Sequence, residues 1–132
     1  MLRRIIYVSR SLVGSDVKKL DAIVQSSVRR NAEAEVTGMM WVCDGQFAQV
    51  LEGSCQRLGQ TMDRILSDCK HTDIQVMLNR SVSSRQFGDW SMRRARVDDA
   101  SDRGSTFMIG FAMGERTPVA KQLYDIVVAS VI

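Results

Sequence analysis

Residues 36–53 read VTGMMWVCDGQFAQVLEG and carry the strongest indication of the fold. Two runs of strand-forming residues, 36–43 and 46–52, flank the dipeptide Asp44-Gly45. Asp-Gly between such runs is a strong β-hairpin signal, because both residues tolerate the positive φ angles of a tight turn. The stretch therefore predicts two antiparallel strands.

The segments on either side of the hairpin complete an alternating order of strands and helices. Residues 2–9 predict a strand, and 17–31 follow a helical stripe that ends in the amide of Asn31. After the hairpin, a second amphipathic helix precedes a strand around 74–78 and a short strand over 90–97. The order β-α-β-β-α-β-β predicts an α+β, ferredoxin-like sheet with two helices on one face.

The C-terminal part changes character at residue 98. Residues 98–105 are polar and acidic, which is typical of a linker, and Thr117-Pro118 predicts the start of a final helix. The apolar stripe of that helix needs a partner, most simply the uncovered face of the sheet. We therefore divide the chain into a domain over 1–97 and a C-terminal extension over 98–132.

Composition excludes several classes of protein. The 132 residues amount to one domain, and no apolar run approaches the ~20 residues that span a membrane. A net charge of +3 is too small to indicate nucleic-acid binding by itself. The three cysteines form no CxxC pair, so we expect no metal site and a reducing, cytoplasmic environment.

Two polar side chains occupy otherwise apolar strands. Gln49 shares a strand face with Phe47 and Leu51, and Tyr7 shares one with Ile5. The first and third strands of this topology are usually neighbours, so Tyr7 and Gln49 are expected side by side on the helix-covered face. From the residues alone, a structural Tyr–Gln hydrogen bond is the favoured interpretation, because a buried amide needs a partner.

These residues belong to a longer pattern that resembles the BLUF family of flavin-binding blue-light sensors. The pattern consists of YVS at 7–9, NAEAEVTG at 31–38, DGQFAQVLEG at 44–53, DCKH at 68–71 and FGDWSM at 87–92. It covers about residues 2 to 97, and FxQxLEG after TG, with an early Tyr and a late WxM, is specific. Lys70 departs from the pattern, because the family usually has Arg-His where this chain has Lys70-His71.

The resemblance implies that the ring of FAD, or of FMN or riboflavin, lies between the two helices. Carried over position by position, the residues expected around the flavin are Tyr7, Asn31, Met40, Gln49, Asp68, Lys70 and His71. In the family's mechanism, the excited flavin takes an electron and then a proton from the tyrosine, here Tyr7. Recombination leaves Gln49 rebonded to the flavin, which produces a small red shift.

The resemblance also implies how the signal leaves the pocket. Trp90 and Met92 would report the switch to the sheet. Ser9 would contact residues that form the pocket without touching the flavin itself. We expect a sensor without enzymatic activity of its own, which acts through a downstream effector protein or a homo-oligomer, with no membrane or nucleic-acid partner.

Two alternatives share the predicted topology. An RNA-binding module of the RRM type would need an exposed sheet face with aromatics and a basic run, which this chain lacks. An acylphosphatase-like hydrolase would need an arginine in an anion-binding loop, and Arg10 is the candidate, although no glycine-rich phosphate nest accompanies it.

Overall fold

A computed structural model of the chain describes residues 1–13, 16–95 and 99–130, and of residues 99–102 it describes the backbone alone. Its elements are β1 (Leu2–Ser11), α1 (Val17–Glu33), β2 (Thr37–Cys43), β3 (Gln46–Ser54), α2 (Cys55–Leu66), β4 (His71–Ser81), β5 (Arg93–Arg94), α3 (Asp99–Glu115) and α4 (Pro118–Ser130).

The hairpin of β2 and β3 forms as predicted. Its turn residues, Asp44 and Gly45, both have positive φ angles, 48° and 75°, as a two-residue type I′ turn requires. The turn fixes the antiparallel register of the two strands, in which Met40 lies opposite Gln49. Gly38 sits where the strands approach closely, since a Cβ there would collide with the carbonyl oxygen of Val50.

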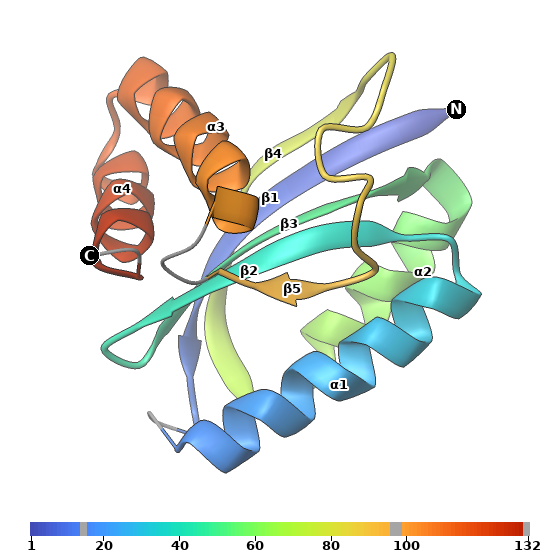
Figure 1. Cartoon of the computed structure of the whole chain (residues 1–132), viewed down its shortest axis with the longest axis horizontal. Helices are drawn as coiled ribbons and strands as arrows, with labels where there is room; N and C mark the ends of the chain where they lie inside the picture. The colour runs from blue at the N-terminus through green and yellow to red at the C-terminus, as the bar shows by residue number, and fades with distance from the viewer. Residues whose placement is uncertain (14–15, 96–98, 131–132) are drawn as a thin grey trace.

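The five strands lie in the order β4-β1-β3-β2-β5, with β1 and β3 in the centre (Figure 1). All neighbouring strands are antiparallel except β2 and β5. The register places Tyr7 of β1 directly opposite Gln49 of β3. The predicted ferredoxin-like topology and the neighbourhood of these two side chains are confirmed.

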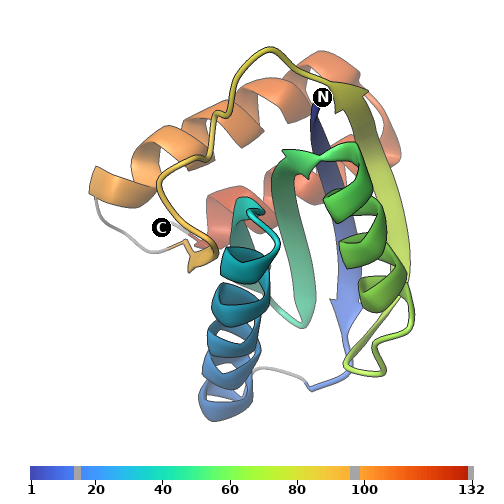
Figure 2. The ribbon, with the colours of Figure 1, turned by 90° about the vertical axis from the view of Figure 1, so that its right-hand side faces the viewer.

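Each face of the sheet carries its own hydrophobic core. Tyr7, Met40 and Leu51 pack with residues of α1 and α2, such as Leu20 and Leu58. On the opposite face, Ile6, Val8, Met39 and Trp41 of the sheet pack with Met108 of α3 and Leu123 of α4. Figure 2 shows α1 and α2 on one side of the sheet and α3 and α4 on the other. The final helix therefore covers the sheet face that the sequence leaves open.

Several boundaries differ from the prediction. β1 extends to Ser11 and β4 covers His71–Ser81, which is longer than the expected 2–9 and 74–78. The last strand comprises Arg93–Arg94 only, and residues 96–98 lie outside the described part of the chain. Residues 99–105 of the expected linker are helical instead, because the helix α3 begins at Asp99.

Tertiary contacts explain why a polar segment is helical here. Gly104 has no side chain that could hold α3 away from the sheet, and a Cβ there would collide with the sulfur of Met39. Ser105 is buried, and its Oγ accepts a hydrogen bond of 2.9 Å from Nε1 of Trp41. Small residues thus serve as contact positions for close helix packing, a role that local polarity does not reveal.

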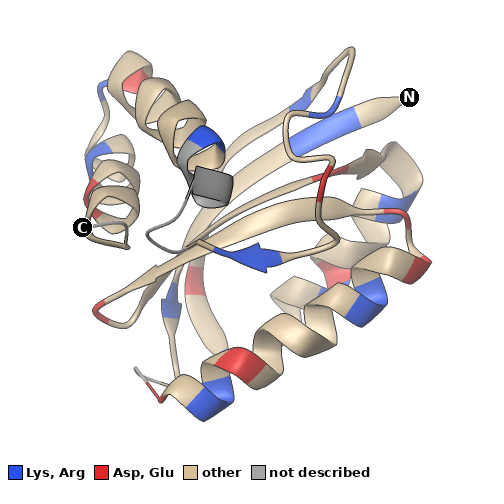
Figure 3. Cartoon of the chain, in the orientation of Figure 1, with Lys and Arg blue, Asp and Glu red and all other residues tan. Residues whose placement is uncertain are grey.

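Charged residues are spread over the elements. Figure 3 shows Lys and Arg on helices and strands alike, interspersed with Asp and Glu. Arg10 lies within β1 and pairs with Asp73 of β4 at 3.1 Å, so it does not belong to an anion-binding loop. Within the described residues, no helix combines the length and the apolar character that crossing a bilayer demands.

Candidate functional site

A cavity opens between the sheet and the helices α1 and α2. Its floor is formed by β1, β2 and β3, and its sides by both helices and the segment that enters β4. The lining residues are Tyr7, Ile23, Ser27, Arg30, Asn31, Met40, Phe47, Gln49, Leu51, Thr61, Arg64, Ile65, Asp68, Lys70 and His71. All seven residues expected around a flavin therefore line one cavity.

Gln49 connects the cavity floor to the segment before β5. The hydroxyl of Tyr7 donates a hydrogen bond to Oε1 of Gln49. Nε2 of Gln49 lies 3.7 Å from the sulfur of Met92, which is a weak acceptor. The amide has two donor hydrogens and two acceptor lone pairs, so these two contacts leave bonding capacity directed at the cavity.

Tyr7 is held in its neutral form. Its side chain is 1% exposed, and burial raises the pKa of the phenol far above its ordinary value. The negative charge of Asp68 adds to this increase in the pKa of Tyr7. A buried phenol whose pKa is raised in this way keeps its proton at physiological pH, so it is available as a hydrogen-bond donor.

Asn31 closes the cavity at the end of α1. Its side chain is buried, and its Nδ2 donates to the carbonyl oxygen of Ser91 at 2.8 Å. Its backbone carbonyl accepts from the backbone N–H of Val36 at 2.8 Å, which fixes the turn into β2. The amide oxygen of Asn31 and its second N–H remain for a bound molecule.

His71 is oriented by contacts on both ring nitrogens. Nε2 lies 3.1 Å from the carbonyl oxygen of Ile65, which can only accept, so this nitrogen carries the hydrogen. In a neutral ring, Nδ1 then accepts from the hydroxyl of Ser9, 2.9 Å away. Ser9 is buried and does not line the cavity, so it acts on the site by orienting His71.

The rim of the cavity is predominantly basic. Arg30, Arg64 and Lys70 line it and are exposed to solvent, whereas Asp68 is half-buried. Oδ1 of Asp68 accepts the backbone N–H of Lys70 at 2.9 Å, which holds the loop before β4. Three cations against one carboxylate favour an anionic group at this opening.

Trp90 and Met92 lie on opposite faces of the sheet, whereas alternation along the strand expected over 90–97 would place both residues on one face. Met92 is buried in the core beside the cavity, whereas Trp90 packs against the core under α3 and α4. The ring of Trp90 lies 5.1 Å from the guanidinium carbon of Arg93, and its backbone carbonyl accepts from Gly38. Strand alternation fails here because residues 90–92 are not part of a strand.

Several lining residues had no role in the sequence-based interpretation. The most informative are Ser27, Thr61 and Arg64, from the helix faces that meet the cavity. Ser27 lies on the apolar stripe of α1, where a small polar residue signals space beside the helix. Arg64 follows Thr61 by one helical turn, a spacing that places both on one side of α2.

The lining matches a flat molecule with one apolar side and one polar edge. Met40, Phe47 and Leu51 supply apolar surface on the floor, and Ile23 and Ile65 supply it on the sides. Asn31 and Gln49 supply amide donors and acceptors at the inner end, and the cations stand at the opening. This donor set fits an isoalloxazine ring with a phosphorylated tail. In the described residues, no cluster of three or more His, Cys, Asp or Glu is placed to hold a metal ion.

Comparison with known proteins agrees with this geometry. A family model described as BLUF, sensors of blue-light using FAD, matches residues 2–93. The blue light- and temperature-regulated antirepressor BluF of Escherichia coli (strain K12) is 32% identical over 92 residues, which make up 70% of this chain and 23% of that protein.

Another relative is the photoactivated adenylate cyclase subunit beta of Euglena longa. It is 29% identical over 99 residues, which are 74% of this chain but only 12% of that protein. The chain thus spans about an eighth of the length of that cyclase subunit. Among solved structures, the dark state of BlrB, a BLUF protein, has the same fold with a TM-score of 0.71 at 24% identity, covering 98% of this chain and 97% of BlrB.

Proposed function

Because this chain belongs to the BLUF family of blue-light sensors that use FAD, we propose that its cavity is the photoswitch, with Tyr7 as electron and proton donor and Gln49 as the switching amide. The observation that carries the proposal is the buried chain of contacts from Tyr7 through Gln49 to Met92. An amide in that position can exchange partners by turning about one bond, without a large motion of the backbone.

We assign the other cavity residues to holding FAD. Asn31 would bond the polar edge of the ring, and His71 would stand beside the phenol of Tyr7, its ring centroid 6.2 Å from that of the tyrosine. Met40 would contact the ring from the cavity floor, and Asp68 would hold Lys70 at the rim. When bound, FAD supplies the blue-light absorption and the electron-accepting capacity that side chains lack.

The simplest experiment compares absorption spectra of the purified chain before and after blue light. We expect a yellow protein whose visible flavin band moves to longer wavelength on illumination and returns in the dark. The proposal fails if the flavin-loaded protein keeps an unaltered band after illumination. The RNA-binding alternative is not favoured, since α3 and α4 cover the sheet face that an RRM would use. The hydrolase alternative is not favoured either, since Arg10 lies within β1 and pairs with Asp73.

The basic rim gives a separate prediction about the flavin tail. Arg64→Ala should weaken FAD and FMN binding about two- to fivefold, as is typical of one exposed cation. The effect should shrink with added salt, because exposed charges are screened. Riboflavin has no phosphate, so its affinity should not change. Flavin titrations followed by fluorescence measure all three affinities.

Arg57→Ala is the matched control for this prediction. Arg57 is an exposed arginine on the same helix, but it does not line the cavity. Equal losses for FAD and riboflavin in Arg64→Ala would show that this residue supports the ring or the helix, and not a phosphate.

Signal output is also part of the proposal. We propose that residues 1–97 sense light and that residues 98–132 pass the change to an effector protein, without catalysis by this chain.

The absence of any disulfide among Cys43, Cys55 and Cys69 supports a cytoplasmic location. A homo-oligomer would need a surface other than the stripe of α4, which is buried against the chain's own sheet. Sedimentation in dark and light tests this point.

A further inference from the structure

A buried carboxylate lies on the far side of the sheet from the cavity. Glu52 is on β3, three residues after Gln49, and its side chain is fully buried on the face under α3 and α4. A buried charge is costly unless it is paired and hydrogen-bonded, so its partners define what it does.

The partners of Glu52 come from β1 and from the β4–β5 loop. Oε2 accepts from Nε of Arg4 at 2.7 Å and from the backbone N–H of Gln86 at 2.9 Å. Oε1 accepts from the backbone N–H of Phe87 at 2.6 Å. The carboxylate thus satisfies two loop N–H groups, that of Phe87 being buried, and one guanidinium, and it fixes the start of the loop segment 86–92.

Arg85 strengthens the same attachment. Its guanidinium donates to the backbone carbonyl of Glu52 at 3.0 Å, to Oγ1 of Thr37 at 2.8 Å and to the carbonyl of Glu35 at 2.8 Å. The loop is therefore tied to β2 and β3 by side-chain contacts immediately before Phe87.

The other end of the same segment contacts the cavity residues. The carbonyl of Ser91 accepts from Asn31, and the sulfur of Met92 accepts from Gln49. A segment of seven residues, 86–92, hence connects a fixed point on one face of the sheet to the switching amide on the other.

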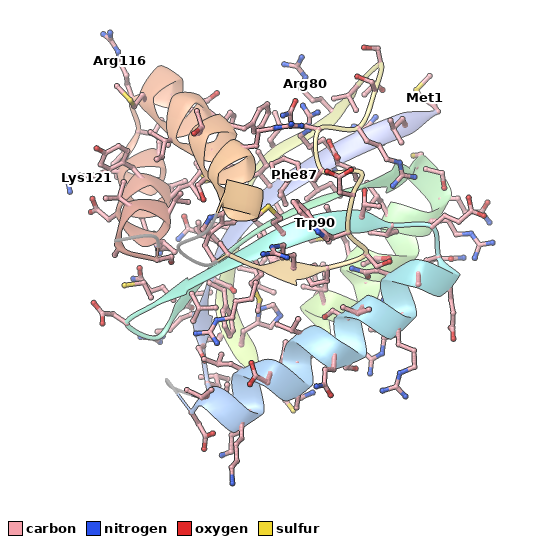
Figure 4. All side chains as sticks on the ribbon, viewed as in Figure 1. Met1, Arg80, Phe87, Trp90, Arg116 and Lys121 are labelled. Carbon is pink, nitrogen blue, oxygen red and sulfur yellow. The ribbon has the colours of Figure 1, made fainter. Side chains whose placement is uncertain are left out.

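Phe87 brings helix α3 into contact with this segment. Its ring is buried and meets Phe107 of α3 edge-on, at 5.5 Å between centroids, and Trp41 at 6.3 Å. A Cβ at Gly104 would lie 3.0 Å from the Phe87 ring, so the helix rests directly on it. Arg4 also stacks over Phe107, 4.9 Å from the ring centre. In Figure 4, Phe87 and Trp90 lie on the connection that passes beside the beginning of α3.

We propose that Glu52, with Arg4, is a positioning residue that makes the segment 86–92 a rigid connection, so that rebonding of Gln49 reaches α3 through Phe87. The inference rests on the proposed photoswitch. The cavity chemistry lies on the opposite face, so Glu52 acts on the output and not on the absorption of light.

The test uses the flavin-loaded full chain and two variants, Glu52→Gln and Phe87→Leu. Gln keeps the shape of Glu but presents an NH₂ donor to groups that need an acceptor, and Leu removes the aromatic contacts while remaining apolar. For the wild type we expect the red shift and a light-minus-dark difference in hydrogen exchange across residues 103–115. For both variants we expect the red shift to persist and that difference to disappear.

Ser105→Ala tests a competing route, in which the change would reach α3 from β2 through Trp41. It removes the hydrogen bond between Trp41 of β2 and α3 but leaves the β4–β5 loop intact. We expect this variant to keep the exchange difference in α3. The proposal is overturned if Glu52→Gln and Phe87→Leu retain that difference, if Ser105→Ala alone loses it, or if α3 of the wild type exchanges identically in dark and light while the red shift is normal. A wild type without a red shift refutes the photoswitch itself.

Discussion

Tyr7→Phe should bind FAD in full and lose its response to blue light. Phe fills the same volume in the core but lacks the hydroxyl that donates to Gln49 and the proton that follows the electron. No tryptophan is among the described cavity-lining residues, since Trp41 and Trp90 both pack on the other face of the sheet. We therefore expect the yield of the red-shifted state to fall at least about 100-fold, the order seen when a proton-transferring group is removed.

Difference spectra at equal flavin content measure this loss, and Tyr124→Phe provides the matched control. Tyr124 is the second tyrosine of the chain and lies half-exposed on α4, so its hydroxyl is remote from the cavity and the photoresponse should be normal. The variant Tyr7→Phe also leaves Oε1 of Gln49 without its donor, which should lower the free energy of unfolding by about 1–3 kcal/mol. A normal red shift in Tyr7→Phe would refute the role of Tyr7 as donor.

Gln49→Leu should abolish the red shift while the protein remains yellow. Leu is close to Gln in size and is compatible with a position between Phe47 and Leu51, but it offers no group that can exchange hydrogen-bond partners. The hydroxyl of Tyr7 would lose its acceptor in a buried environment, and the free energy of unfolding should fall by about 1–3 kcal/mol.

Gln46→Leu is the matched control, because it removes an amide from the same strand without removing the amide that is proposed to switch. Gln46 begins the same strand, is half-buried and lies outside the cavity lining, so its variant should photoswitch normally. Absorption spectra before and after illumination, with denaturant unfolding in the dark, give both quantities. Persistence of the full red shift in Gln49→Leu would contradict the switching role of the amide.

Local sequence patterns predict some of the residues that form the site, but not all of them. Alternation and the Asp44-Gly45 turn fix which residues of β2 and β3 face the helices, because a strand shows its side chains to either face in turn. The sequence motif also places Asn31 and His71 at the cavity, where the structure has them. Arg64 and Thr61 come to the same cavity from α2 without any motif that marks them.

The amino-acid sequence was sufficient to predict the order of the elements, the hairpin, the pairing of Tyr7 with Gln49 and the family. The order of the elements and the hairpin follow from short-range periodicity, which needs only neighbouring residues. The pairing follows from the usual neighbourhood of the first and third strands in this topology, and the family from a motif spread over residues 2 to 97. Three features became visible only in the folded chain: residues 99–105 are helical, Met92 and Trp90 lie on opposite faces of the sheet, and Glu52 holds the β4–β5 loop. Each of these depends on contacts between residues far apart in the chain, such as Glu52 and Gln86, 34 positions apart. The reason is that packing and buried hydrogen bonds override local propensity wherever a side chain has a distant partner.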